Sequence, residues 1–333
     1  MFYKQRGELE TAQNLTEKLV KLAQSLQDPE LIIEASFAMG SLLYYLGEHV
    51  LAQEYLDQGI NNYELIKHHA LTLLYDQDLG VALLSYASSN LRLLGYPDRA
   101  LERCAETLAL ARELSHPYSL AMALSYTDWV HLFLNNNETV LEQSQALISL
   151  SAEHDFQLYL ALGTLQKGRA MTEQGDVDAG ITQMQQGLTT AAMAIGSDNA
   201  SPAMLLHLAK AYCKSRLPDE GLLVVAKVLK QLKKSEERLQ ESEIYRLKGE
   251  FLLIRGEPDN EVEANFQQAI DISHRQQAKS LELRAVMSLS RLWQSQGKPE
   301  AAHQILVEIY DWFTEGFDTY DLKEANALLK ELS

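Results

Sequence analysis

The stretch Asp78–Leu114, DLGVALLSYASSNLRLLGYPDRALERCAETLALAREL, decides the fold of this chain. Apolar residues recur every three or four positions from Val81 to Leu94, which predicts a helix. Gly95 and the proline that follows two residues later end that helix, because glycine suits a left-handed cap and proline cannot continue the helical hydrogen bonds. Asp98 is expected to begin a second helix. The result is a helical hairpin that is too small to bury both of its apolar faces, and such units are stable when stacked on copies of themselves.

Copies of this hairpin follow one another along the chain. A turn, usually with a glycine, is preceded by a small residue seven positions earlier and followed by another five positions later. The residues in these three positions are Gly40, Gly47, Ala52, Ser88, Gly95, Ala100, Gly168, Gly175, Gly180, Ala209, Gly221, Gly249, Gly256, Ser290, Gly297 and Ala302. Small side chains are needed where the two helices of a hairpin cross at roughly 8 Å. The turn at Asn135–Asn137 is the weak copy, because it has no small pair.

This pattern resembles the tetratricopeptide (TPR) repeat over nearly the whole chain. The turns recur about every 40 residues, whereas that repeat usually has a period of roughly 34 residues, so we expect helices about a turn longer than usual. The resemblance implies an all-α, right-handed superhelical solenoid of helix-turn-helix repeats.

The expected organisation is a single solenoid over residues 1–333 with about seven hairpins. A lone helix in residues 1–27 precedes the repeats of residues 28–314, and a capping helix in residues 315–333 follows them. Two interpretations of the lone helix stay open: it is the second helix of a repeat cut from a longer protein, or it is an N-terminal cap. The extra segment Glu64–Gln77 contains His68 and His69, which point to different sides of a helix, so a linker is favoured over a metal site.

Composition limits the function. The chain has 333 residues, 46% hydrophobic content and a formal net charge of −17, which argues against nucleic acid or an anionic membrane surface as partner. No apolar run is long enough to span a bilayer, and no signal-peptide core begins the chain. Cys104 and Cys213 are expected to be small buried residues in a reducing cytoplasm, rather than a disulfide or a metal site.

No catalytic motif is present. Gly163–Ala170 superficially matches a phosphate-binding loop, but Arg169 replaces the lysine that reaches the phosphates and Ala170 cannot ligate magnesium. The segment also follows no strand. We therefore expect no enzyme, no cofactor and no metal.

The inner face of the solenoid is the expected binding surface. In TPR solenoids the first helix of each hairpin lines a concave groove, at positions three, six and ten residues before the turn glycine. These positions and their neighbours bring several cations to the groove of an acidic chain, together with polar residues: Arg92, Arg169, Lys210, Arg246, Arg284, Arg291, Tyr44 and Ser89. One hypothesis is that they bind an acidic or phosphorylated ligand or an acidic peptide. The alternative is that they pair with neighbours, for example Arg246 with Glu250 one turn away.

Several stretches resemble a narrower group, the C-terminal repeat region of bacterial adenylate cyclase and STAND-type AAA ATPase signalling proteins. They are Gly95–Leu101, Glu243–Glu250, Gln277–Arg284 with Arg291–Gly297, and the tail Trp312–Thr319 with Asp321–Ala325. The repeat domain of the maltose-regulon activator is a more distant relative. The resemblance implies a sensor or regulatory arm that binds an inducer or partner and releases an upstream ATPase domain, and it transfers no ligand-contact residue.

Two functions therefore compete. One is the sensor arm of a larger signalling ATPase, with a small-molecule inducer, a protein or an acidic peptide as ligand. The other is an independent TPR scaffold that docks partner proteins.

Overall fold

The computed structural model describes residues 9–63, 77–196 and 201–333. In these ranges the chain forms sixteen α-helices and no strand. They are α2 (Leu9–Leu26), α3 (Pro29–Leu46), α4 (His49–Asn62), α7 (Leu79–Leu94), α8 (Pro97–Leu114), α9 (Pro117–Phe133), α10 (Asn137–Glu153), α11 (Gln157–Glu173), α12 (Val177–Ile195), α13 (Pro202–Lys214), α14 (Pro218–Leu232), α15 (Glu241–Arg255), α16 (Asp259–Arg275), α17 (Lys279–Ser295), α18 (Pro299–Tyr310) and α19 (Tyr320–Leu332).

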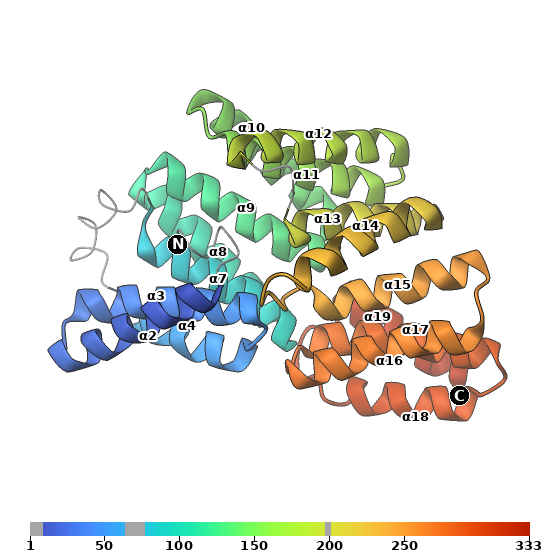
Figure 1. The fold of residues 1–333 in the computed structure, drawn as a ribbon. Helices are drawn as coiled ribbons and strands as arrows, with labels where there is room; N and C mark the ends of the chain where they lie inside the picture. Colours follow the sequence, from blue (N-terminus) through green and yellow to red (C-terminus); the bar gives the residue numbers. More distant parts are fainter. Residues whose placement is uncertain (1–8, 64–76, 197–200) are drawn as a thin grey trace.

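Consecutive helices from α3 to α18 pack in antiparallel pairs, with α2 before them and α19 after them (Figure 1). The prediction of an all-α, TPR-like solenoid is confirmed, and helix lengths reach 19 residues in α12. Gly7 and the linker residues His68 and His69 lie outside the described residues.

The turns inside the pairs use left-handed backbone. Gly47 ends α3 with φ of 79° and Gly95 ends α7 with φ of 100°. In the weak copy, Asn135 takes φ of 63°. Asparagine tolerates this conformation better than most residues because its short polar side chain can bond locally, so the turn forms without glycine.

The small residues lie where paired helices cross. A Cβ atom on Gly168 would lie 2.6 Å from the carbonyl oxygen of Gly180, and one on Gly40 would lie 2.7 Å from the Leu56 side chain. The backbones of α11 and α12 therefore approach so closely at this point that no side chain fits between them.

The first helices of the last six pairs form a closed ring. The contacts run from α7 to α9, α11, α13, α15 and α17, and α17 contacts α7 again. We call these six helices the inner ring. All sixteen residues of α7 are buried, because neighbours cover it on both sides. Figure 1 shows the last helices, orange and red, beside the first, blue and cyan.

Contacts between early and late helices lie where the ring closes. The Tyr45 carbonyl oxygen of α3 accepts from the backbone N–H of Arg238, in the loop before α15, at 2.9 Å. The Gln276 side chain packs against Gly47 at the end of α3, and it donates to the Arg238 carbonyl at 2.9 Å. Farther along the same boundary the Trp312 ring lies 5.6 Å from the Tyr96 ring, centre to centre. We call this boundary between the first and last repeats the seam.

Two expectations were wrong. Asp98 does not cap α8: this helix begins at Pro97, and its N-cap Tyr96 makes no side-chain hydrogen bond. Glu315 from the far end of the chain accepts from the free N–H groups of Asp98 and Arg99 instead. Cys213 is only half-buried, unlike Cys104; both thiols are free.

Within the described ranges, no helix combines the length and apolar character that crossing a membrane requires.

Candidate functional site: a cation cluster on the inner ring

Five of the expected groove cations converge on the inner ring. Arg92 comes from α7, Arg169 from α11, Lys210 from α13, Arg246 from α15 and Arg284 from α17. Their charges act on one another: Arg284, Arg169 and Arg246 all disfavour the ammonium of Lys210. We call these five side chains the cation cluster. They lie far apart in sequence, and the closure of the ring brings them together.

Glu243 lies at the centre of one half of the cluster. Its carboxylate is 2% exposed; it accepts from Arg246 at 2.8 and 3.0 Å and pairs with Lys210 at 3.0 Å. Burial alone would raise the pKa of this carboxyl, but Arg246 and Lys210 hold it well below its usual range. Arg246 also pairs with Glu250 at 3.1 Å, as the alternative interpretation of the sequence expected.

Two further cluster members have carboxylate partners. Arg169 pairs with Glu173, whose carboxylate also receives Lys214 at 2.6 Å. Arg284 pairs with Asp321 of α19 at 2.7 Å. Part of the positive charge of the cluster is therefore neutralised by carboxylates of the protein itself.

Arg92 differs from the other members. It is 8% exposed and has no carboxylate partner among the described residues. Its one hydrogen bond runs from Nη2 to the Tyr44 hydroxyl at 3.5 Å, which is long for such a contact. Its Nε is sealed from solvent and bonds to nothing.

The cluster carries excess positive charge. Together with Lys214 it has six cations. Among the residues that the structure describes, these six contact four carboxylates: Glu173, Glu243, Glu250 and Asp321. On α9, burial raises the pKa of the Asp128 carboxyl well above its usual range, which favours the neutral form. Both of its oxygens are sealed without a hydrogen bond.

Two other residues predicted for the groove, Arg291 and Ser89, are not members of the cation cluster. Arg291 pairs with Glu324 at 3.1 Å, and about half of its side chain is exposed. Ser89 is buried in α7, with its hydroxyl sealed and without a hydrogen bond.

Sequence reasoning missed three aromatic or imidazole residues beside the cluster. The His207 ring packs against the Trp129 ring at an angle of 37°, with ring centres 4.3 Å apart. Burial, and then the charges of Lys210, Arg169 and Arg92, lower the pKa of His207 well below its usual value, so its ring is neutral. Phe133 packs against Arg92 and Arg284. Trp129 occupies the groove position six residues before Asn135, so applying the repeat register to the weak copy would have found it.

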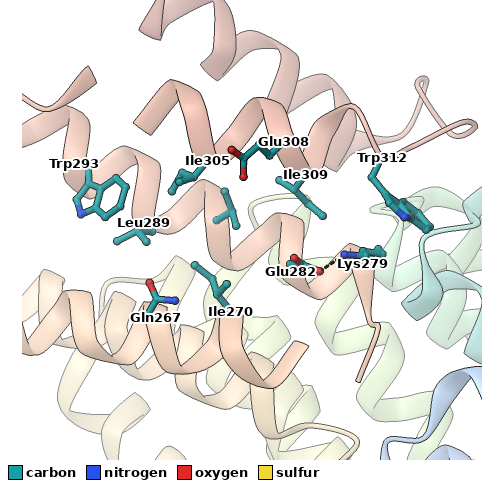
Figure 2. A pocket seen from close by; sticks show the side chains of 11 residues that line it. Gln267, Ile270, Lys279, Glu282, Leu289, Trp293, Ile305, Glu308, Ile309 and Trp312 are labelled. Carbon is teal, nitrogen blue, oxygen red and sulfur yellow. Dashed lines mark hydrogen bonds and ion pairs between the residues drawn. The ribbon is translucent and has the colours of Figure 1, made fainter. Parts of the chain in front are cut away.

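A separate pocket of about 250 Å³ lies between α16, α17 and α18 (Figure 2). Ile270, Leu289 and Ile305 line its apolar wall, and Lys279 pairs with Glu282 at 2.7 Å near one end, beside Trp312. The pocket contains no member of the cation cluster. Among the described side chains, no three His, Cys, Asp or Glu residues are grouped so that they could hold a metal ion.

No protein-family model and no curated protein matches the chain. Solved structures do. A Rap protein in complex with competence and sporulation factor has a TM-score of 0.51 and 13% identity, over 100% of this chain and 74% of that one. A tetratricopeptide repeat protein from Parabacteroides merdae ATCC 43184 has a TM-score of 0.48 and 14% identity, over 90% and 98%. The apo form of RapI has a TM-score of 0.40 and 14% identity, over 99% and 96%.

At such low identity, the similarity to the first of these structures shows the fold alone. The chain has the fold of a TPR-like array of helical hairpins.

Proposed function

We propose that this chain is a non-catalytic binding module whose inner ring takes an acidic segment of a protein or peptide partner. One observation carries the proposal: within the described part of the chain, six cations on one inner surface contact four carboxylates, although the net charge of the whole chain is −17. A partially desolvated cation attracts a carboxylate more strongly than an exposed one does, because water screens it less.

The larger context belongs to the proposal as well. The chain is a single solenoid domain, residues 1–333, and serves in the cytoplasm as the sensor arm of a bacterial signalling ATPase. The sequence resemblance of the tail Trp312–Thr319 supports this role. The alternative is an independent scaffold that docks partner proteins. The Rap structure, which has the same kind of fold, contains a bound factor, and this supports a ligand-binding role.

The test measures the binding of an amidated, N-acetylated hexaglutamate peptide to the full chain. Titration calorimetry gives its affinity at low and at physiological salt. We expect binding that weakens with salt and that falls at least tenfold in Arg169→Gln/Lys210→Gln. The charge-reversed pair Arg169→Glu/Lys210→Glu should abolish it. The matched control, Lys227→Gln/Lys230→Gln, removes two exposed cations from the outer helix α14 and should leave the affinity unchanged.

Equal loss in the control pair, or no binding of hexaglutamate to the folded wild-type chain, would contradict the proposal. A thermal-shift screen then distinguishes the sensor arm from the independent scaffold. A ligand at 100 times its Kd adds about 2.7 kcal/mol of stability, which raises the melting temperature measurably. Stabilisation by a small molecule supports the sensor arm, and stabilisation by a protein partner alone supports the scaffold.

A further inference from the structure

Two arginines from opposite ends of the repeat array share one aromatic ring. The guanidinium carbon of Arg92 lies 4.7 Å from the centre of the Phe133 ring, and that of Arg284 lies 3.7 Å from it. Arg92 belongs to the first complete pair after residue 77, and Arg284 to the last pair. Arg284 also donates from Nη2 to the Phe133 carbonyl oxygen at 2.6 Å.

The two cations are neutralised unequally. Arg284 has Asp321 at 2.7 Å, whereas Arg92 has only the long contact with Tyr44. Arg246, which is half-buried in the same cluster, has two carboxylate partners. This pair of arginines therefore has one carboxylate for two positive charges.

A buried cation without a counter-ion costs free energy, because it has lost its water without gaining a partner. Burial lowers the pKa of Arg92 below its ordinary value, and the neighbouring charge of Arg284 lowers it further. One monoanionic group beside Arg92 would balance the charge of the Arg92–Arg284 pair. The missing charge thus matches a single carboxylate.

We propose that Arg92 and Arg284, held on Phe133, form the subsite that takes a carboxylate of the ligand, and that its occupancy favours the closed ring. This rests on the proposed binding function. Since one arginine comes from α7 and the other from α17, an anion bound by both has a higher affinity for the closed state and shifts the equilibrium toward it.

Two probes distinguish the sources of the carboxylate. The first is the amidated hexaglutamate, which offers side-chain carboxylates only. The second is N-acetyl-Gly-Ser-Gly-Ser-Gly-Ser, which offers only its C-terminal carboxylate. The probe that binds shows whether the subsite accepts a side-chain carboxylate or a C-terminal carboxylate.

Arg92→Met tests the subsite. Since it removes an unpaired buried charge, its melting temperature should equal or exceed that of the wild type, while affinity for the bound probe falls at least tenfold. Arg92→Lys keeps the charge and should stay within about threefold of wild type. If Arg92→Met binds the probe like wild type, while Arg169→Gln/Lys210→Gln loses binding, the subsite is refuted and the proposed function stands. If neither probe binds the wild-type chain, both fail.

Closure is tested by hydrogen exchange at the seam. The amide hydrogens of Asp98, Arg99 and Gly316 take part in hydrogen bonds between the two ends of the array. A saturating probe should slow their exchange at least threefold in the wild-type chain and leave it unchanged in Arg92→Met. Unchanged exchange in the liganded wild type would refute the link between occupancy and closure.

Discussion

Glu315 caps a helix that begins more than 200 residues earlier. Its Oε1 accepts hydrogen bonds from the backbone N–H of Asp98 at 2.9 Å and of Arg99 at 3.1 Å. In return, the Asp98 carboxylate accepts from the backbone N–H of Gly316 at 3.0 Å. A capping contact, usually local, here joins α8 to the segment between α18 and α19.

Glu315→Ala should therefore destabilise the chain and loosen the seam. Loss of an N-terminal cap typically costs about 1 kcal/mol, and we expect that decrease in the free energy of unfolding, with faster hydrogen exchange at Asp98 and Arg99. Glu331→Ala, an exposed residue near the end of α19, is the control and should change neither quantity. Equal stability of both variants would contradict the capping role.

Glu237 makes stability depend on pH at the other end of the seam. Burial raises the pKa of its carboxyl to about 7, and its charge acts on Tyr44 and Tyr45. The folded-state pKa of Glu237 exceeds the usual 4.5. Its contribution to the free energy of unfolding is therefore fully present below about pH 4.5 and is lost as the pH rises through 7. Glu237→Gln should thus gain stability above pH 7, by about 1 kcal/mol for this half-buried group.

The control for Glu237 is its exposed neighbour, Glu236→Gln, which should follow the wild-type curve at every pH. Urea denaturation between pH 4.5 and pH 8 measures both variants. A Glu237→Gln curve parallel to that of the wild type would contradict the prediction.

Lys210 should make acidic-probe binding take up protons. Burial, partly offset by Glu243, lowers the pKa of its ammonium to about 8. At pH 8 about half of the Lys210 side chains are neutral; a bound carboxylate favours the charged form, so up to about half a proton is absorbed. The affinity for the acidic probe should fall as the pH rises above about 8. The contribution of Lys210 to folding stability should instead increase between pH 8 and its ordinary pKa of 10.5.

Calorimetry in buffers of different ionisation enthalpy measures this uptake. Lys210→Gln should show none, and identical binding heats in both buffers for the wild type would contradict the assignment.

Gly168→Ala should weaken the crossing of α11 and α12. The added methyl would meet the Gly180 backbone, which cannot rotate away as a side chain does. We expect a loss of about 2–3 kcal/mol, despite the better helix propensity of alanine. Gly256→Ala is the comparison, since its Cβ meets nothing within 4 Å and only its left-handed backbone is strained, at about 1 kcal/mol. A Gly168→Ala chain as stable as wild type would refute the argument.

Local patterns were sufficient to predict the hairpins. Apolar spacing from Val81 to Leu94, a turn glycine and a small residue on each side depend on neighbours within about 20 residues, and the structure has helices at these places. The start of α8 was misassigned because its cap comes from Glu315. The ion pairs of the cations could be predicted only in part. Arg246 and Glu250 are one helical turn apart, so the sequence predicts their pairing. Arg284 and Asp321 are far apart in sequence, so it does not.

The sequence by itself determined that this chain folds as stacked helical hairpins, because helix periodicity, turn chemistry and small crossing residues all act over short range. Only the tertiary structure decided that the array closes on itself. Small rotations between successive pairs add up along the chain, and their sum brings α17 against α7. That closure places Arg92 and Arg284 on one Phe133 ring, where we propose that they bind a carboxylate.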